Sequence, residues 1–246
     1  MIKTELEQLL VDTFNIKNSS VLESLYIYYE MLFETSKVMN LTTITEEEDV
    51  YIKHFYDSIL ALKHIENTSN ITLLDIGSGA GLPGIVLKIA YPNIQITLLE
   101  PTTKRCNFLN SAIEKLGLKG IIVINDRAEN YIKNNRESFD IVTGRAVASL
   151  NILSELSLAY VKKDGYFIAM KGQNYLEELE ISGNAISKMG GKLDKIYTYS
   201  LPKESGNRCI ITIKKEKTTI TAVFRLKKPY KLMIGTKIIG KINIYK

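Results

Sequence analysis

The spacing of apolar residues changes near residue 70. From residue 71 onward, short apolar runs alternate with longer amphipathic stretches, a pattern typical of alternating strands and helices. The runs predict seven strands, at residues 71–76, 94–99, 121–125, 139–144, 165–170, 193–200 and 208–215. The stretches between them predict helices at 83–91, 103–117, 149–161 and 174–189, with a short helical turn at 128–133. Repeated strand–helix units imply right-handed crossovers and a mainly parallel sheet.

The last two predicted strands are joined differently from the others. Their loop contains Pro202 and Gly206 and is too short for a helical crossover, so we expect an antiparallel hairpin. The predicted fold class is therefore α/β, a Rossmann-like sheet of seven mainly parallel strands that ends in an antiparallel pair.

The first seventy residues show a helical pattern. Ser20–Glu23 forms a possible capping box that begins a helix reaching about residue 36, and Thr45–Glu48 begins another that reaches about residue 65. We therefore predict a helical cap at residues 1–70, a core at 71–216 and a basic tail at 217–246.

A glycine-rich segment directly follows the first predicted strand. Residues 73–84 read LLDIGSGAGLPG, where Gly77 and Gly79 permit a tight turn and the close approach of a ligand. Pro83 fits the first turn of a helix, where its missing N–H costs nothing. Strand, glycine loop and helix together predict the cofactor-binding corner of a doubly wound sheet.

Two classes of cofactor fit this corner. Residues 79–84 satisfy the dinucleotide pattern G-x-G-x-x-G, which is weak evidence alone. A pyrophosphate is disfavoured beside the carboxylate of Asp75, whereas S-adenosylmethionine has no phosphate and carries two positive groups. Glu100, at the end of the second strand, can accept both ribose hydroxyls of either cofactor. The pattern favours the methyl donor, and NAD and an ordinary polar strand end remain alternatives.

The composition limits the class of protein. With 45% apolar and 24% charged residues, the chain resembles an ordinary soluble globular protein. The polar N-terminus does not resemble a signal peptide, and no apolar run reaches the roughly 18 residues of a membrane span. Cys106 and Cys209 lack metal-ligand spacing, so we expect free thiols, no metal site and a cytoplasmic location.

Positive charge is concentrated near the C-terminus. Residues 203–246 contain twelve Lys or Arg and two Glu, whereas the rest of the chain is slightly acidic. A basic segment of this kind favours a polyanionic partner such as a nucleic acid. The alternative is a solvated edge whose lysines prevent aggregation of the sheet.

Polar residues follow five successive predicted strands. Because the carboxyl ends of parallel strands meet at one edge, where such sheets bind ligands, these residues predict a single site. They are Asp75 and Gly77, then Glu100, then the segment 126–129, then Arg145, and finally Lys171 and Gly172.

At these segments the sequence resembles a known family, the small-subunit ribosomal RNA guanine-N7 methyltransferases of the G type. The Arg-Ala-Val-Ala-Ser-Leu segment at 145–150 and the His-Phe-Tyr-Asp-Ser segment at 54–58 are its most specific features. The other matching stretches are 40–42, Lys53, 75–84, 104–105, 127–129 and 171–172.

The resemblance implies a class I methyltransferase fold, S-adenosylmethionine as donor and 16S ribosomal RNA, naked or in the 30S particle, as acceptor. The methylated atom would be N7 of a guanine in the 530 loop, guanine 527 in the usual numbering. The expected cofactor contacts are Asp75, Gly77, Gly79, Leu82, Glu100, Ala128, Glu129 and Arg145. The expected RNA contacts are Asn40, Lys104, Arg105, Lys171, Arg225, Lys227 and Lys228. We expect a monomer without metal or membrane association.

Two positions depart from the family pattern. Glu100 stands where relatives usually have Asp, so its reach toward a ribose can differ. The C-terminal Tyr-Pro-Arg segment common in the family is replaced by residues 224–229, FRLKKP, which keep the positive charge.

The chemistry of guanine N7 sets what the site must do. N7 has an in-plane lone pair and no proton to lose, so the enzyme must align the reactants and exclude water. We therefore assign no general base, give Arg145 a positioning role and expect His54 to pack or hydrogen-bond nearby. The alternatives are a small-molecule methyltransferase, an NAD-dependent oxidoreductase and an RNA-binding protein without activity.

Overall fold

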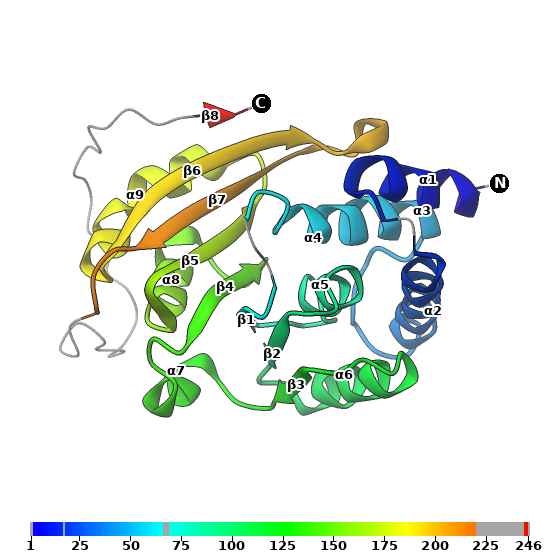
Figure 1. Ribbon diagram of the computed structural model, residues 1–246, viewed down its shortest axis with the longest axis horizontal. Coiled ribbons are helices and arrows are strands. Elements are labelled where there is room, and N and C mark those ends of the chain that lie inside the picture. Colours follow the sequence, from blue (N-terminus) through cyan, green and yellow to red (C-terminus); the bar gives the residue numbers. More distant parts are fainter. Residues whose placement is uncertain (1, 17, 66–68, 220–243, 246) are drawn as a thin grey trace.

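The computed structural model describes residues 2–16, 18–65, 69–219 and 244–245 (Figure 1). Its strands are β1 Thr72–Ile76, β2 Gln95–Leu99, β3 Ile121–Ile124, β4 Phe139–Arg145, β5 Val161–Lys171, β6 Gly191–Ser200, β7 Asn207–Lys215 and β8 Ile244–Tyr245. Its α-helices are α1 Ile2–Phe14, α2 Ser19–Ser36, α3 Glu47–Val50, α4 Asp57–Leu60, α5 Gly84–Ala90, α6 Thr103–Lys115, α7 Ala128–Tyr131, α8 Leu150–Leu158 and α9 Tyr175–Lys188. The π-helix η1 spans Tyr51–Tyr56, and short 3-10 turns occur at η2 Ile132–Asn134 and η3 Pro202–Glu204.

The strands form one sheet in the order β3-β2-β1-β4-β5-β7-β6-β8. Strands β1 to β5 pair in parallel, and β7 lies antiparallel between β5 and β6. The seven predicted strands and the antiparallel hairpin are thus confirmed. The two-residue strand β8 adds an eighth member beside β6, which the sequence pattern did not predict.

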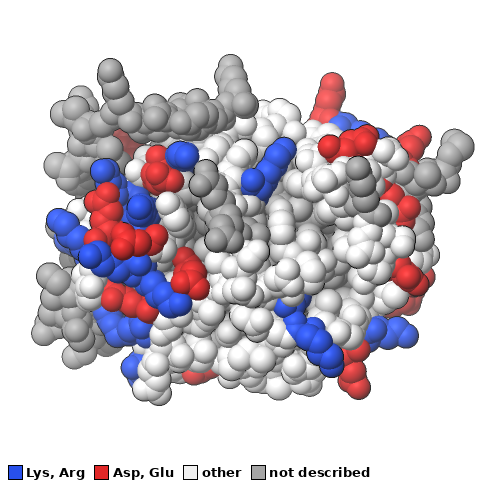
Figure 2. Space-filling model, in the orientation of Figure 1, with Lys and Arg blue, Asp and Glu red and all other residues white. Residues whose placement is uncertain are grey.

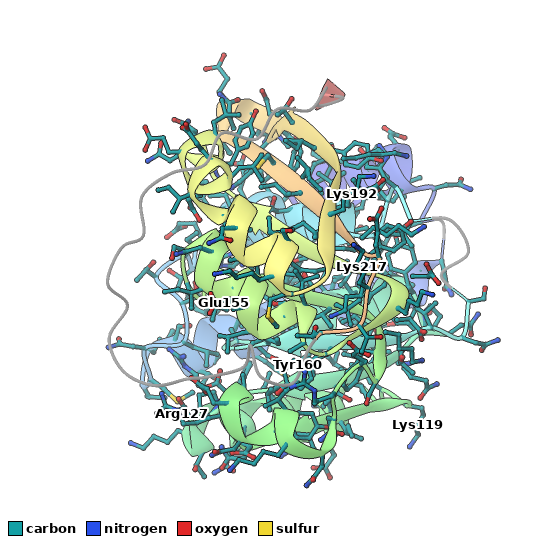
Figure 3. The ribbon with its side chains drawn as sticks, turned by 90° about the vertical axis from the view of Figure 1, so that its left-hand side faces the viewer. Lys119, Arg127, Glu155, Tyr160, Lys192 and Lys217 are labelled. Atoms are coloured by element: carbon teal, nitrogen blue, oxygen red, sulfur yellow. The ribbon has the colours of Figure 1, made fainter. Side chains whose placement is uncertain are left out.

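Both faces of the sheet are buried, which explains why its strands read as continuous apolar runs. Neighbouring residues alternate between the two faces, so that Leu73 and Ile141 join one core while Leu74 and Val142 join the other. Helices α1 to α6 cover the first face, and α7, α8 and α9 lie on the second (Figure 1). In Figure 3 α8 and α9 lie side by side on that second face.

The N-terminal helices differ in detail from the prediction. Helix α2 is capped by Asn18, which accepts the Ser20 N–H, and not by the predicted Ser20. The predicted helix at 45–65 is divided into α3, η1 and α4, and α1 was not foreseen as a separate helix. These helices share one core with α5 and the sheet. The division of the chain at residues 70 and 216 stays a prediction.

The boundary between α8 and β5 is the clearest error of the sequence prediction. The predicted helix at 149–161 ends at Leu158, and β5 begins at Val161. The carbonyl of Tyr160 accepts the N–H groups of Ser138 and Phe139, which draws this segment into the sheet. An apolar run fits a buried strand and a buried helix equally well, so the pattern alone could not place the boundary.

Candidate active site

The glycine loop between β1 and α5 has the conformation that its sequence requires. Gly77, Gly79 and Gly81 have φ angles of 66°, 56° and 88°, a region that other residues rarely adopt. The N–H groups of Gly77 and Ser78 both donate to the carbonyl of Leu99 at the end of β2. The loop is therefore fixed where the two strand ends meet.

Glu100 holds the same loop through its carboxylate. The side chain is 2% exposed, and Oε2 accepts the N–H of Gly79 at 2.9 Å while Oε1 accepts that of Thr102 at 2.9 Å. Each oxygen keeps a lone pair for a further donor. A ribose hydroxyl can use these lone pairs, so the position fits the predicted cofactor contact.

Asp75 lies beneath the loop and is fully buried. Its Oδ2 accepts the N–H of Gly84 at 2.9 Å, and its Oδ1 has no hydrogen-bond partner among the described residues. Burial raises the pKa of this carboxyl to about 7, partly opposed by the hydrogen bond from Gly84. An acidic loop with an unsatisfied buried oxygen suits a cofactor that carries positive charge and no phosphate.

A second polar cluster lies at the end of β4 around Arg145. Its Nη1 donates to the Lys53 carbonyl at 3.1 Å and to Asp57 Oδ2 at 3.3 Å, and its Nη2 lies 2.9 Å from His54 Nδ1. A guanidinium can only donate, so this contact requires Nδ1 to accept, whereas the Lys53 carbonyl, 3.1 Å from the same Nδ1, requires it to donate. The other ring nitrogen, Nε2, lies 3.0 Å from Thr42 Oγ1.

The charges in this cluster are buried and interdependent. Burial and the adjacent Arg145 lower the pKa of His54 to about 3, so the imidazole is neutral at physiological pH. Burial raises the pKa of Asp57, although Arg145 and the hydroxyl of Tyr199 oppose the shift. That hydroxyl donates to Asp57 Oδ1 at 2.7 Å. The guanidinium is thus held in one orientation by a chain of partners.

The π-helix η1 brings these partners together. Lys53 and His54 lie within it, and Asp57 follows it at once as the first residue of α4. A π turn is wider than an α turn and is frequent at functional sites. Here it presents the Lys53 carbonyl and the His54 ring to the same guanidinium. The sequence pattern predicted a helix at this place but could not reveal its irregular turn.

The segment after Arg145 crosses the glycine loop. A Cβ atom built on Gly77 would lie 2.9 Å from Val147 Cγ2, so Val147 packs directly over that glycine. Lys171 secures the segment, because its Nζ donates to the Ala148 carbonyl at 2.8 Å and pairs with Glu178 Oε2 at 2.7 Å. The same carboxylate oxygen accepts the N–H of Leu150 at 2.6 Å, at the start of α8.

A cavity of about 650 Å³ opens between η1 and the ends of β4 and β5. Its lining residues are Ile44, Lys53, His54, Asp57, Arg145, Ala146, Val147, Ala148, Ser149, Met170, Lys171, Gly172, Glu178 and Arg208. Arg208 comes from β7 and was missed by the sequence analysis, since it stands alone before an apolar run. Among the described residues, no carboxylate forms an ion pair with Arg208.

The remaining predicted site residues take different positions. Leu82 is buried in the glycine loop, and Ala128 and Glu129 begin α7. In Figure 3 Arg127 projects at the outer edge near α7. Asn40 and Lys104 are exposed, and Arg105 Nη1 lies 4.0 Å from Glu100 Oε1.

Two groups of predicted RNA contacts need separate comment. The ammonium of Lys171 is engaged with Ala148 and Glu178, and its side chain is only 9% exposed. Its contact with RNA therefore stays a prediction that the geometry does not favour. The other group, Arg225, Lys227 and Lys228, lies outside the described residues.

The sheet order, the glycine loop and the acidic strand ends define a class I S-adenosylmethionine-dependent methyltransferase, with S-adenosylmethionine as its cofactor. Solved structures of the same fold include an S-adenosylmethionine-dependent methyltransferase from Aquifex aeolicus, with a TM-score of 0.51 and 18% identity over 68% of this chain and 93% of that chain. TYW2 of M. jannaschii in complex with AdoMet has a TM-score of 0.51 and 16% identity over 65% of this chain and 74% of that chain. At these identities the likeness shows the fold alone.

The sequence comparisons are more specific. The family model described as rRNA small subunit methyltransferase G matches residues 21–206. The Ribosomal RNA small subunit methyltransferase G of Oceanobacillus iheyensis is 49% identical over 199 residues, which are 80% of this chain and 84% of that protein. The protein of the same name from Staphylococcus carnosus is 47% identical over 195 residues, 78% of this chain and 81% of that protein. The chain belongs to the ribosomal RNA small subunit methyltransferase G family.

Proposed function

We propose that this methyltransferase transfers the methyl group of S-adenosylmethionine to N7 of a guanine in the 530 loop of 16S ribosomal RNA. The observation that carries the proposal is the cavity beside the glycine loop. Neutral His54 and two guanidinium groups, Arg145 and Arg208, line it. Family membership and the basic C-terminal composition support an RNA acceptor over a small molecule.

Each end of the site has a distinct task in this reaction. Glu100 and the glycine loop hold the cofactor, which supplies a methyl group on a positively charged sulfur. Arg208 donates to the guanine O6 or to a phosphate, since its planar fork suits both. Arg145 shapes the cavity wall through its bonds to His54 and Asp57. The segment 146–149 covers the junction between the two ends and excludes water.

The acceptor chemistry needs no general base, and the cluster is built accordingly. Both ring nitrogens of His54 already have partners, Nδ1 in Arg145 and the Lys53 carbonyl and Nε2 in Thr42, so neither is free to take a proton from a substrate. At saturating cofactor, the single-turnover rate should be flat between about pH 6.5 and 8.5, without an ionisation near the ordinary histidine pKa. A wild-type titration that disappears in His54→Ala would contradict this mechanism.

Exposed basic and polar side chains supply the proposed contacts with the RNA backbone. Lys104 and Arg105 lie in the first turn of α6, next to Glu100 at the end of β2, and Asn40 is an exposed residue two positions before Thr42. Figure 2 shows that Lys and Arg intermix with Asp and Glu at the left of that view, whereas the centre of the face is largely uncharged. The described surface in this view therefore offers no extended basic patch.

The direct test uses labelled S-adenosylmethionine with 30S particles that lack the modification and, separately, with naked 16S RNA. Borohydride reduction followed by aniline cleaves RNA at N7-methylguanine. We expect one new cleavage in the 530 loop. Transfer of label without such cleavage would overturn N7 as the acceptor atom, and transfer only to small molecules would overturn RNA as the substrate.

A further inference from the structure

A second groove adjoins the cavity at the same end of the sheet. It has a volume of about 550 Å³ and lies between the start of α9 and the hairpin of β6 and β7. Gly172 and Arg208 line both hollows. A Cβ atom built on Gly172 would meet nothing within 4 Å, so the chain at this junction is open to a close approach by a ligand.

The lining of this groove has a consistent chemistry. Tyr175 contributes a half-buried aromatic ring, and Gln173 and Asn207 contribute amides. The hydroxyl of Ser200 lies 2.8 Å from Asn207 Oδ1, which leaves the amide nitrogen of Asn207 with donors for another group. None of the described residues that line the groove is acidic, and Arg208 is its one charged side chain.

This combination matches what proteins use to hold an unstacked ribonucleotide. Aromatic rings stack on the base, amides pair with its edge, and a guanidinium binds the phosphate. An enzyme that modifies a base either acts on a single strand or turns that base out of its stack, so the adjoining nucleotide loses a stacking partner on at least one face. The neighbour then lies next to the cavity that holds the guanine.

We propose that the groove is a subsite for the ribonucleotide adjoining the methylated guanine, with its base stacked on Tyr175 and the connecting phosphate at Arg208. The inference rests on the proposed function, because the first cavity must hold the guanine. It assigns to α9 a role in binding the acceptor that neither the glycine loop nor the Arg145 cluster can fill.

The test separates stacking from packing at Tyr175, because part of its ring also contacts the core beneath α9. Tyr175→Phe keeps the flat ring, and Tyr175→Leu keeps apolar bulk without one. Leu176→Ala, at the exposed next position of α9, is the matched control. With unmodified 30S particles, Tyr175→Leu should raise the KM for the particle roughly 5- to 100-fold. The KM values of Tyr175→Phe and Leu176→Ala should stay within about twofold of the wild-type value.

A second measurement identifies the ligand as a base. The 30S particles are reconstituted with 16S RNA that lacks the base on the 5′ or the 3′ side of the guanine. One abasic site should raise KM in the wild type and add nothing in Tyr175→Leu, since both remove the same contact. The affinity for S-adenosylmethionine, measured by calorimetry, should be equal in all variants.

The possible results are distinguishable. Equal KM values for Tyr175→Phe, Tyr175→Leu and the wild type would overturn the subsite and leave the proposed function intact. Additive effects of both abasic sites with Tyr175→Leu would likewise overturn it. A wild-type protein that produces no N7-methylguanine in the same particles would overturn the proposed function, and the subsite with it.

Discussion

At the scale of single residues, Arg145 is the side chain with the most demanding surroundings. It donates to a carbonyl and a carboxylate, and it also lies 2.9 Å from an imidazole nitrogen. Lysine has one compact ammonium on a flexible stem and cannot reproduce a planar fork. The cluster should therefore depend on the shape of the guanidinium as well as on its charge.

Replacement of Arg145 by lysine should lower kcat/KM for methyl transfer by at least about tenfold, roughly 1.4 kcal/mol of transition-state stabilisation. Arg136→Lys is the matched control, because Arg136 neither lines the cavity nor is a predicted cofactor contact, and its Nη2 donates to the Thr219 carbonyl at 3.3 Å. The control should be indistinguishable from the wild type in the same single-turnover assay. Full activity of Arg145→Lys would show that charge alone suffices.

Asp75 predicts a pH dependence of cofactor binding. Burial raises its pKa to about 7, so near neutral pH the cofactor-free protein holds part of a proton there. A positively charged cofactor favours the carboxylate and lowers this pKa. Binding should therefore release a fraction of a proton near pH 7, and affinity should rise as the pH increases from about 6 to 8.

Calorimetry in buffers of different ionisation enthalpy measures this proton directly. Asp75→Asn keeps the size of the side chain and cannot titrate, so the proton released on cofactor binding should disappear in this variant.

The pKa of Asp75 in the folded protein also lies above the ordinary value for Asp, so this group favours folding at acidic pH and loses that contribution as the pH rises toward 7. Equal proton release by Asp75→Asn would assign the titration to another group.

Sequence reasoning identified the residues of the site that follow parallel strands. Asp75, Glu100 and Arg145 were predicted because the carboxyl ends of such strands converge. Arg208 and Glu178 were missed, since one comes from the antiparallel hairpin and the other from a helix surface. Their places in the cavity depend on long-range packing that no local pattern encodes. Lys171, predicted from its place after the fifth strand, lines the cavity, but its ion pair with Glu178 became visible only in three dimensions.

At the scale of elements, local patterns again predicted some features, whereas those that depend on long-range packing were missed. The strands were predictable because each is an apolar run, and the hairpin because its loop is short. The π-helix η1 and the start of β5 were not, because they depend on partners distant in sequence. Among the elements, α2 matters most for cofactor binding, because this N-terminal helix contacts the glycine loop between β1 and α5. The hydroxyl of Tyr28, a fully buried residue of α2, donates to the Ala80 carbonyl.

We expect Tyr28→Phe to weaken the binding of S-adenosylmethionine about two- to tenfold, the range for loss of one hydrogen bond. The ring would still stack on Phe55, whose centroid lies 5.7 Å away, so the helix should stay in place. Tyr26→Phe changes a half-buried tyrosine of the same helix and serves as control. If both variants bind the cofactor as the wild type does, α2 covers the loop without positioning it.

At the scale of the whole molecule, buried polar contacts of Lys215 and Thr219 anchor the end of the described core. Lys215 is fully buried, and its Nζ donates to the carbonyls of Leu158 at 2.6 Å and Met189 at 2.8 Å and also contacts the hydroxyl of Thr219. The N–H of Thr219 donates to Glu137 Oε1 at 2.7 Å. Burial lowers the pKa of Lys215, opposed by Glu137. A truncation that removes Thr219 would disturb this anchor and confuse weaker RNA binding with lower stability.

The role of the basic tail is therefore best tested by neutralising charge in the full chain. Residues 220–246 contain seven Lys or Arg and no Asp or Glu, and the tail lies almost wholly outside the described residues. Replacing Arg225, Lys227 and Lys228 by Gln should weaken RNA binding and reduce the slope of log K against log salt by about 2 to 3. Each phosphate that the variant no longer neutralises accounts for roughly 0.7–0.9 of that change.

The matched control removes equal charge from exposed residues that line neither the cavity nor the groove, at Lys119, Lys133 and Lys192. That variant should keep the wild-type slope of log K against log salt, because lysines that neutralise no phosphate release no counterions when the RNA binds. Affinity for S-adenosylmethionine should be unchanged in both proteins, since the glycine loop and Glu100 are intact. Equal slopes for the two variants would show that the tail lysines form a solvated edge, and that specificity for RNA comes from the cavity and its rim.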